Sequence, residues 1–195
     1  MNNNFKFKLA SFLATYFNIG RVKYAPGTFG SLATFPLFVL ISTICIPTQG
    51  NYLLLRISLI FLFILFSIFC ISYWSINIYI KETHKEDPSE VVIDEVLGQM
   101  IAYIMPIFLF LYFKIRYNIE LTNVENIILN IILITMPFIF FRFFDIMKFG
   151  LVGYCDTKID GAIGIIMDDV VAGVYAGLLV SLIFIITFGG IFIIK

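Results

Sequence analysis

The chain has 195 residues, of which 61% are hydrophobic and only 13% are charged, and its mean hydropathy is +1.00. Soluble domains are about 45–50% apolar and about 25% charged, so this composition excludes an ordinary soluble domain. Basic and acidic residues balance at 13 each, and the zero net charge gives no electrostatic reason to expect nucleic acid as a partner.

The first expected element is an N-terminal segment, residues 1–24, which begins MNNNFKFKLASFLATYF. Basic residues accompany a short apolar stretch that Ser and Thr interrupt, and no small-residue cleavage site follows. This pattern predicts an amphipathic segment that lies at the membrane interface, rather than a cleaved signal peptide.

Five apolar stretches follow, each close to the length of about 20 residues that a helix needs to cross the hydrocarbon. We expect these spans at about 29–46, 52–80, 92–113, 125–147 and 164–194. The first is short and could instead be re-entrant, and Pro106 and Pro137 are expected to kink the third and fourth. The predicted fold class is therefore all-α, with residues 1–195 forming one polytopic helical membrane domain.

The distribution of basic residues predicts the orientation of the spans. With the N-terminus inside, nine Lys and Arg residues lie on the cytoplasmic side and four on the other: Lys6, Lys8, Arg21, Lys23, Lys81, Lys85, Arg142, Lys148 and Lys158 against Arg56, Lys114, Arg116 and Lys195. This topology brings the segments YAPGTFGS, EDPSEVVIDEVLG, FRFFD and IDGAIGIIMDD to the cytoplasmic face. We therefore expect the functional site at that face.

Two pairs of adjacent acids lie where apolar spans begin: Asp94 with Glu95, and Asp168 with Asp169. A carboxylate at bilayer depth costs about 2.5–3.5 kcal/mol, whereas an acid at a helix N-terminus gains only about 0.3–1 kcal/mol from the helix dipole. We favour a divalent cation shared by the four carboxylates over simple helix-start acids. Oxygen ligands without His or Cys suit Mg²⁺, Mn²⁺ or Ca²⁺.

Glycines near these acids favour close approach of the helices that carry them. Gly98 lies one turn after the first pair, and Gly164 and Gly173 lie one turn before and after the second. Small residues of this kind let membrane helices touch, and generic membrane packing is the alternative explanation. Beside the acids, they predict packing that unites both pairs in one site.

Three further features could bind phosphate. The segment PGTFGS offers backbone N–H groups and hydroxyls just before an expected helix start, although a Pro-Gly turn capped by Ser31 explains it equally well. Arg142 could clamp a phosphate or pair with Asp145, three residues later. Lys148 is either a snorkelling interfacial lysine or a second phosphate contact. Together with a metal, these features describe an enzyme for a phosphorylated lipid or polyprenyl substrate.

The sequence lacks the signatures of other phosphatase mechanisms. The chain has no arginine six residues after Cys155, only one histidine (His84, expected in a solvated loop), no D-x-D and no P-loop. Metal-activated water or direct attack by a carboxylate remains. A cation- or proton-coupled transporter is a further alternative, because intramembrane acids also mark ion pathways. Acids at one face and the absence of an evident internal repeat argue against it.

Four ordered motifs resemble the phosphatidylglycerophosphatase A family of bacterial membrane enzymes: APGTFGSLATFP at 25–36, DPSEVVIDEVLGQ at 87–99, FRFFDIMK at 141–148 and DGAIGIIMDDVVAG at 160–173. The resemblance implies Mg²⁺-dependent hydrolysis of phosphatidylglycerophosphate to phosphatidylglycerol in phospholipid biosynthesis, at the cytoplasmic face of the inner membrane. The substrate and the membrane lipids are the expected partners. A phosphatase for phosphatidic acid or a polyprenyl phosphate is the alternative.

Transferred to the matching positions, the resemblance implies three groups of site residues. The metal-binding and catalytic acids are Asp94, Glu95, Asp168 and Asp169. The candidate phosphate contacts are Gly27, Thr28, Gly30, Ser31, Arg142 and Lys148. The supporting positions are Gly98, Asp145, Asp156, Gly164 and Gly173. The chain departs from the usual family pattern after Lys148, where it has FGL in place of a Pro-x-Pro turn, and we expect a loop at 149–163.

Overall fold

The computed structural model describes residues 3–45 and 52–189, which are helical with no strand. In chain order the elements are α1 (Asn3–Ala14), the 3-10 helix η1 (Ile19–Arg21), α2 (Pro26–Cys45), α3 (Leu53–Thr83), α4 (Ile93–Arg116), α5 (Asn123–Met147), α6 (Leu151–Lys158), α7 (Gly161–Phe184) and the π-helical segment η2 (Ile185–Gly189). Five of the described helices, α2, α3, α4, α5 and α7, are long and apolar enough to cross a membrane. The predicted all-α, multi-pass membrane fold is confirmed.

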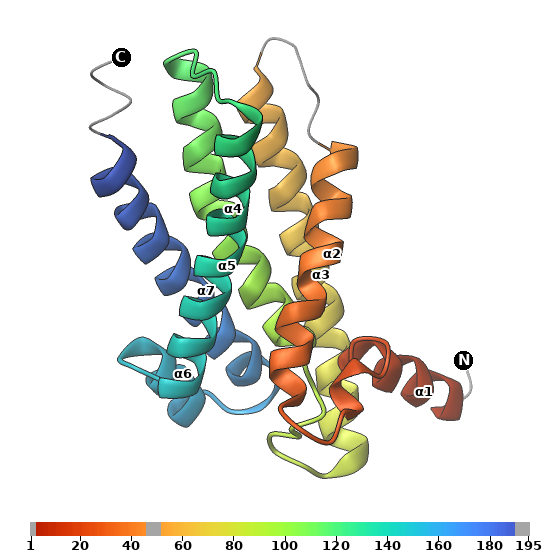
Figure 1. Cartoon of the computed structure of the whole chain (residues 1–195). Coiled ribbons are helices and arrows are strands. Elements are labelled where there is room, and N and C mark those ends of the chain that lie inside the picture. The colour runs from red at the N-terminus through yellow and green to blue at the C-terminus, as the bar shows by residue number, and fades with distance from the viewer. Residues whose placement is uncertain (1–2, 46–51, 190–195) are drawn as a thin grey trace.

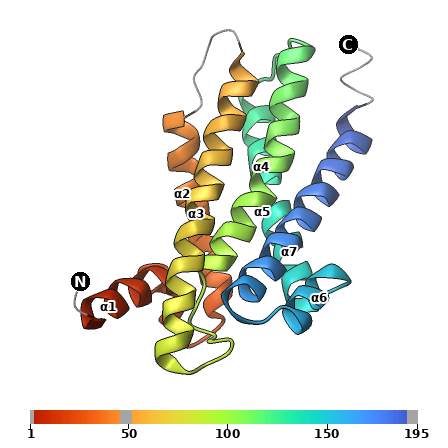
Figure 2. The ribbon, with the colours of Figure 1, turned by 180° about the vertical axis from the view of Figure 1, so that it is seen from behind.

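The five long helices stand together as one bundle, and α1 lies across one end of it (Figure 1). The view from behind shows α6 at the same end as α1 (Figure 2). Helix α4 packs most extensively against α7 and also contacts α2, α3 and α5. Half of the apolar window of α4 is buried, more than in any other candidate span. The helix that carries the first acid pair is therefore the centre of the bundle.

The predicted spans agree with the observed helices to within three residues wherever both ends are described. Position 46 of the first predicted span and positions 190–194 of the fifth lie outside the described residues. Helix α2 is continuous over 20 residues, about 30 Å at 1.5 Å per residue, so its described part does not turn back as a re-entrant segment would. Pro106 and Pro137 both lie inside continuous helices.

Helix α2 begins earlier than the sequence predicts, which changes the setting of four candidate phosphate contacts. Pro26 is the first residue of α2, a position that suits proline because its fixed φ matches the helix and its missing N–H is not needed there. Gly27, Thr28, Gly30 and Ser31 therefore lie in the first two turns of a helix, and the expected loop before the helix is absent. The hydroxyl of Ser31 is buried and donates to the Gly27 carbonyl over 2.9 Å.

The expected loop at 149–163 is also wrong, because most of it forms the short helix α6. Val152 and Cys155 are buried one turn apart on α6, and this helix packs on α7. Lys148 and Gly150 have positive φ values of 49° and 58° and make the tight turn from α5 into α6. Val152 shares a buried cluster with Ala172 and Ala176 of α7, so packing on α7 accounts for this helix.

Hydrogen bonds at one end of the bundle determine where α4 begins. The Val92 N–H, just before α4, donates to the carbonyl of Ala14 at the end of α1 over 3.0 Å. The carboxylate of Glu90 accepts from the Tyr79 hydroxyl at 3.0 Å and pairs with Lys85 at 2.6 Å. The end of α1 and the last turns of α3 thereby position the first acid pair.

Candidate active site

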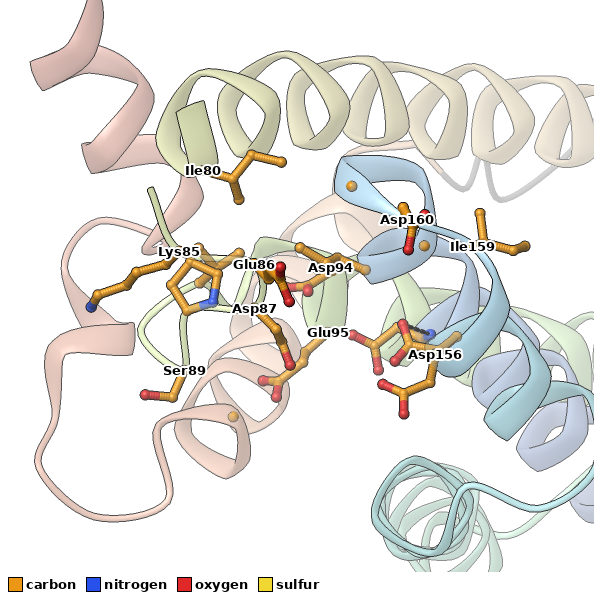
Figure 3. Close-up of a pocket in the computed structure, with 18 of the residues that line it drawn as sticks. Ile80, Lys85, Glu86, Asp87, Ser89, Asp94, Glu95, Asp156, Ile159 and Asp160 are labelled. Atoms are coloured by element: carbon orange, nitrogen blue, oxygen red, sulfur yellow. Dashed lines mark hydrogen bonds between the residues drawn. The ribbon is translucent and has the colours of Figure 1, made fainter. Parts of the chain in front are cut away.

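A cavity of about 770 Å³ opens at this end of the bundle (Figure 3). Figure 3 shows Asp94 and Glu95 from α4 and Asp156 from α6 around it. Its wall contains all four predicted catalytic acids, together with Asp145. The tertiary structure therefore brings together two acid pairs that lie 74 positions apart in the sequence.

Close contact between α4 and α7 produces this convergence. A Cβ atom at Gly98 would lie 2.5 Å from the backbone oxygen of Asp169 and 2.6 Å from the Phe141 ring, and one at Gly173 would overlap the Gly98 carbonyl. Only glycine permits two backbones to approach so closely. The predicted close approach of these helices is thus present at Gly98 and Gly173.

Gly164 serves a different contact from the one predicted. A Cβ atom there would overlap the carbonyl oxygen of Ile159 and lie 3.6 Å from that of Cys155. The Cys155 carbonyl belongs to α6, and the Ile159 carbonyl belongs to the connection between α6 and α7. Gly164 therefore admits the preceding turn of the chain and does not lie in the contact between the two acid-bearing helices.

Several oxygens of the acid cluster are buried without a hydrogen-bond donor in the described part of the chain: Asp94 Oδ1, Glu95 Oε2 and Asp169 Oδ1. Asp94 is only 6% exposed and Asp169 only 4%. The charges of Asp94, Glu95, Asp145 and Asp168 all act on Asp169. Because buried carboxylates without partners are strongly unfavourable, this cluster requires a cation or protons.

The donor chemistry of the cluster fits a hard divalent cation. Its donors are carboxylate oxygens, which Mg²⁺ and Ca²⁺ prefer, and three of those oxygens have no other partner in the described part of the chain. Within residues 3–45 and 52–189, no three His, Cys, Asp or Glu side chains are already arranged to hold a metal ion.

Arg142 connects two of the acids. Its Nη1 atom lies 3.2 Å from the Glu95 carboxylate and 2.7 Å from that of Asp145, and it donates to the Ser31 hydroxyl at 3.3 Å. The side chains of this ion-pair network are only 15–16% exposed. Of the two alternatives that the sequence left open for Arg142, the ion pair with Asp145 is present. Arg142 does not belong to the cavity wall, so these contacts assign it to holding Glu95 in place.

The glycines at the start of α2 lie against the same acid. A Cβ atom at Gly27 would overlap the Glu95 carboxylate, and one at Gly30 would lie 2.9 Å from Glu95 Oε2. Gly27 belongs to the cavity wall, whereas Thr28, Gly30 and Ser31 do not. The described contacts of Gly27 and Gly30 are therefore packing contacts around Glu95, and among these four positions Gly27 alone faces the cavity.

Lys148 brings a positive charge to the second acid pair. Its ammonium pairs with Asp156 of α6 and lies 3.5 Å from Asp168 Oδ2. Partial burial pulls the pKa of Lys148 down, but the hydrogen bond to Asp156 and the charge of Asp168 outweigh burial and raise that pKa above its usual value. Lys148 therefore stays charged in the cavity wall, and Asp156 holds it there.

Sequence reasoning missed three residues at or near this site. Lys81 and His84 line the cavity, and His84 is exposed, as a loop histidine would be. Gln99 lies one turn beyond Glu95 on α4, is fully buried, and neither polar atom of its amide has a partner within the described residues. An amide inside an apolar span is a signal that could have identified Gln99 from the sequence.

Replacing Arg142 should destabilise the protein more than replacing an exposed arginine. In Arg142→Met the carboxylates of Glu95 and Asp145 lose their shared partner, and breaking a buried ion pair costs about 3 kcal/mol. Thermal unfolding in detergent measures this as a lowered midpoint. Arg116→Met, which removes an exposed arginine from the far end of α4, should leave the midpoint nearly unchanged. Equal midpoints for the two variants would contradict the bridging role.

Comparison with known proteins identifies the family of this chain. The family model described as phosphatidylglycerophosphatase A matches residues 12–184, which include the cavity and the four motifs. Phosphatidylglycerophosphatase A of Haemophilus influenzae is 30% identical over 168 residues, which is 86% of this chain and 84% of that protein. No solved structure matches the chain. The chain belongs to the phosphatidylglycerophosphatase A family.

Proposed function

We propose that this protein removes the terminal phosphate of phosphatidylglycerophosphate and leaves phosphatidylglycerol. As a member of its family the chain is a phosphoric monoester hydrolase. The observation that carries the site assignment concerns Asp94, Glu95 and Asp169, which line the cavity. Each has a buried carboxylate oxygen without a partner among the described residues. A polar cavity at one end of an apolar bundle suits a lipid substrate. Its acyl chains stay in the bilayer while its phosphate group extends into the cavity.

Magnesium dependence is part of the proposal. Asp94, Glu95, Asp168 and Asp169 would hold the ion, because they supply the oxygen donors that Mg²⁺ prefers. A bound ion would also relieve the repulsion among their charges. When bound, Mg²⁺ would polarise the phosphoryl group as a Lewis acid.

The chain's own residues would bind the substrate and move the protons. Lys148, held by Asp156, contributes a positive charge near the phosphate. A carboxylate of the acid cluster accepts the proton of the attacking water as a general base. Lys81 and His84 line the same cavity and face the remaining negative charge of the headgroup, which is the phosphodiester.

We also place the cavity at the cytoplasmic face of the bacterial inner membrane. The end of the bundle with the cavity carries α1, the α3–α4 connection and α6 (Figures 1 and 2). Nine of the 13 Lys and Arg residues belong to that side in the N-inside topology, as the positive-inside rule requires.

The test of this function is phosphate release by the purified protein in detergent. We expect release from phosphatidylglycerophosphate in the presence of Mg²⁺, little release after chelation, and recovery when Mg²⁺ is added back. Phosphatidic acid should be a poorer substrate, because it lacks the headgroup phosphodiester that Lys81 and His84 would face.

Each alternative outcome has a distinct meaning. Faster release from phosphatidic acid would support the proposed mechanism but would show that phosphatidic acid is the preferred substrate. Release that survives chelation would overturn the magnesium proposal. No release from either lipid by folded protein would contradict the phosphatase function.

A further inference from the structure

A second depression, of about 340 Å³, lies between α1 and α3. We call it the α1–α3 groove, and its wall includes Lys6 of α1 and Trp74, Asn77, Lys81 and Glu82 of α3. Trp74, Asn77 and Lys81 follow one another at helical spacing and therefore share one face of α3. The groove presents two ammonium groups, a carboxylate, an amide and an indole ring.

The charged groups of this groove are available to a ligand. None of Lys6, Lys81 and Glu82 forms an ion pair within residues 3–45 and 52–189, although all three line the same groove. The two ammonium groups outnumber the carboxylate. The groove therefore favours an anion that can also exchange hydrogen bonds with Asn77 and Glu82.

Packing holds one wall of the groove in place. The Phe7 ring stacks on that of Tyr79 with centroids 6.0 Å apart, and Ala10 and Ala14 are fully buried. Lys6 precedes Phe7 and is therefore positioned beside α3. The groove depends on folded contacts between α1 and α3 and not on the chance position of a surface lysine.

The groove lies at a depth where lipid headgroups are found. Trp74 is 21 residues beyond Leu53 at the other end of α3, about 32 Å along a helix axis, which is close to the hydrocarbon thickness of about 30 Å. Tryptophan and tyrosine concentrate at this boundary. Helix α1 lies across the bundle there (Figures 1 and 2) and exposes Phe5, Leu9 and Phe12 on one face. Such an apolar face belongs at the membrane interface.

We propose that the α1–α3 groove binds the headgroup of an anionic phospholipid, with phosphatidylglycerol the best match. Lys6 binds the phosphodiester, because basic pockets between membrane helices hold anionic headgroups. The ammonium of Lys81, which lines both the groove and the cavity, adds positive charge beside it. Asn77 and Glu82 bind the hydroxyls of a glycerol headgroup. Lys81 lines both this groove and the acidic cavity, so the bound lipid lies next to the active site. The proposal does not depend on the phosphatase function, because phosphatidylglycerol carries no phosphate monoester.

Trp74 allows a direct test, because it is the chain's single tryptophan. The full chain is placed in lipid nanodiscs, and brominated phosphatidylglycerol or brominated phosphatidylcholine, which quench a neighbouring indole, is titrated in. We expect half-maximal quenching of Trp74 fluorescence at a several-fold lower fraction of phosphatidylglycerol. Raised salt should weaken this preference in the unaltered protein, because the attraction is between charges.

Two lysine variants separate a site from general surface charge. Lys6→Gln should raise the fraction of phosphatidylglycerol needed for half-maximal quenching about five-fold, the contribution of one lysine near an anionic lipid. Lys8→Gln removes an exposed lysine of α1 that does not line the groove and should match the unaltered protein. Equal quenching by both lipids in the unaltered protein, or equal shifts in the two variants, would overturn the proposal. Neither readout requires catalysis, so failure here leaves the proposed phosphatase function untouched.

Discussion

Replacing Asp169 by Asn is expected to lower the rate of phosphate release from phosphatidylglycerophosphate by about 100- to 1,000-fold, the effect of removing one key charge-stabilising group from an active site. The Oδ1 atom of Asp169 is buried without a partner in the part of the chain that the structure describes, and the side chain lies among four other carboxylates. Asparagine keeps the shape and removes the charge that a cation would neutralise. Measurement of phosphate release at saturating Mg²⁺ tests this result.

The same substitution should stabilise the protein when Mg²⁺ is absent. A neutral amide relieves repulsion within the acid cluster, so the free energy of unfolding should rise on the order of 1 kcal/mol. Thermal unfolding with chelator measures this change. Asp94→Asn should act in the same direction, because Asp94 is also buried and has an oxygen without a partner within residues 3–45 and 52–189.

An exposed acid supplies the control for both measurements. Glu120→Gln changes a carboxylate between α4 and α5, away from the cavity wall, and should alter neither activity nor stability. Loss of stability in Asp169→Asn under chelation would show that its carboxylate is already compensated in the protein. That outcome would contradict the site as we describe it.

Replacing Gly173 by Val should prevent the acid pairs from meeting. A Cβ atom at Gly173 would overlap the carbonyl of Gly98, which belongs to backbone and cannot rotate away. Overpacking of this kind costs about 1–3 kcal/mol even where side chains can adjust, so we expect the upper end of that range. Activity should fall to background, because moving α7 from α4 separates Asp169 from Asp94. Unfolding midpoints and phosphate release both test the result.

Gly177 offers a matched control one turn further along α7. A Cβ atom there would meet the Met105 side chain, with its sulfur at 2.7 Å. The sulfur can move with a change of rotamer, and the Met105 Cβ, at 3.0 Å, needs only a small shift. Gly177→Ala should therefore cost less than Gly173→Val and leave activity largely intact. If Gly177→Ala and Gly173→Val were equally damaging, general helix packing would explain the glycines without any link to the acids.

The helices themselves followed from the sequence because lipid imposes a simple rule on them. Backbone groups in hydrocarbon must be satisfied within the segment, so an apolar run of about 20 residues predicts a helix whatever its neighbours are. The acid pairs were identifiable for the same reason, since carboxylates such as Asp168 and Asp169 are costly in an apolar run. Helix α6 could not be predicted in this way, because the burial of Val152 and Cys155 depends on packing against α7.

Contacts between distant segments were beyond the reach of any local pattern. Arg142 and Glu95 are 47 positions apart, and Arg142 and Ser31 are 111 apart, so nothing in the local sequence indicates that the arginine meets either of them. From the sequence, the segment PGTFGS is explained equally well as an anion-binding loop or as a Pro-Gly turn capped by Ser31. Only the structure shows that Gly27 and Gly30 lie against Glu95.

Local composition was therefore enough to reveal a membrane protein with five spans and two improbable acid pairs, because transfer into lipid acts on each segment separately. Three other features depend on how the helices pack: the meeting of those pairs in one cavity, the ion pair that holds Glu95 to Arg142, and the α1–α3 groove. Packing between helices is decided by the shapes of several segments at once, through contacts such as that between Gly98 and Gly173, and no single stretch of the chain contains that information.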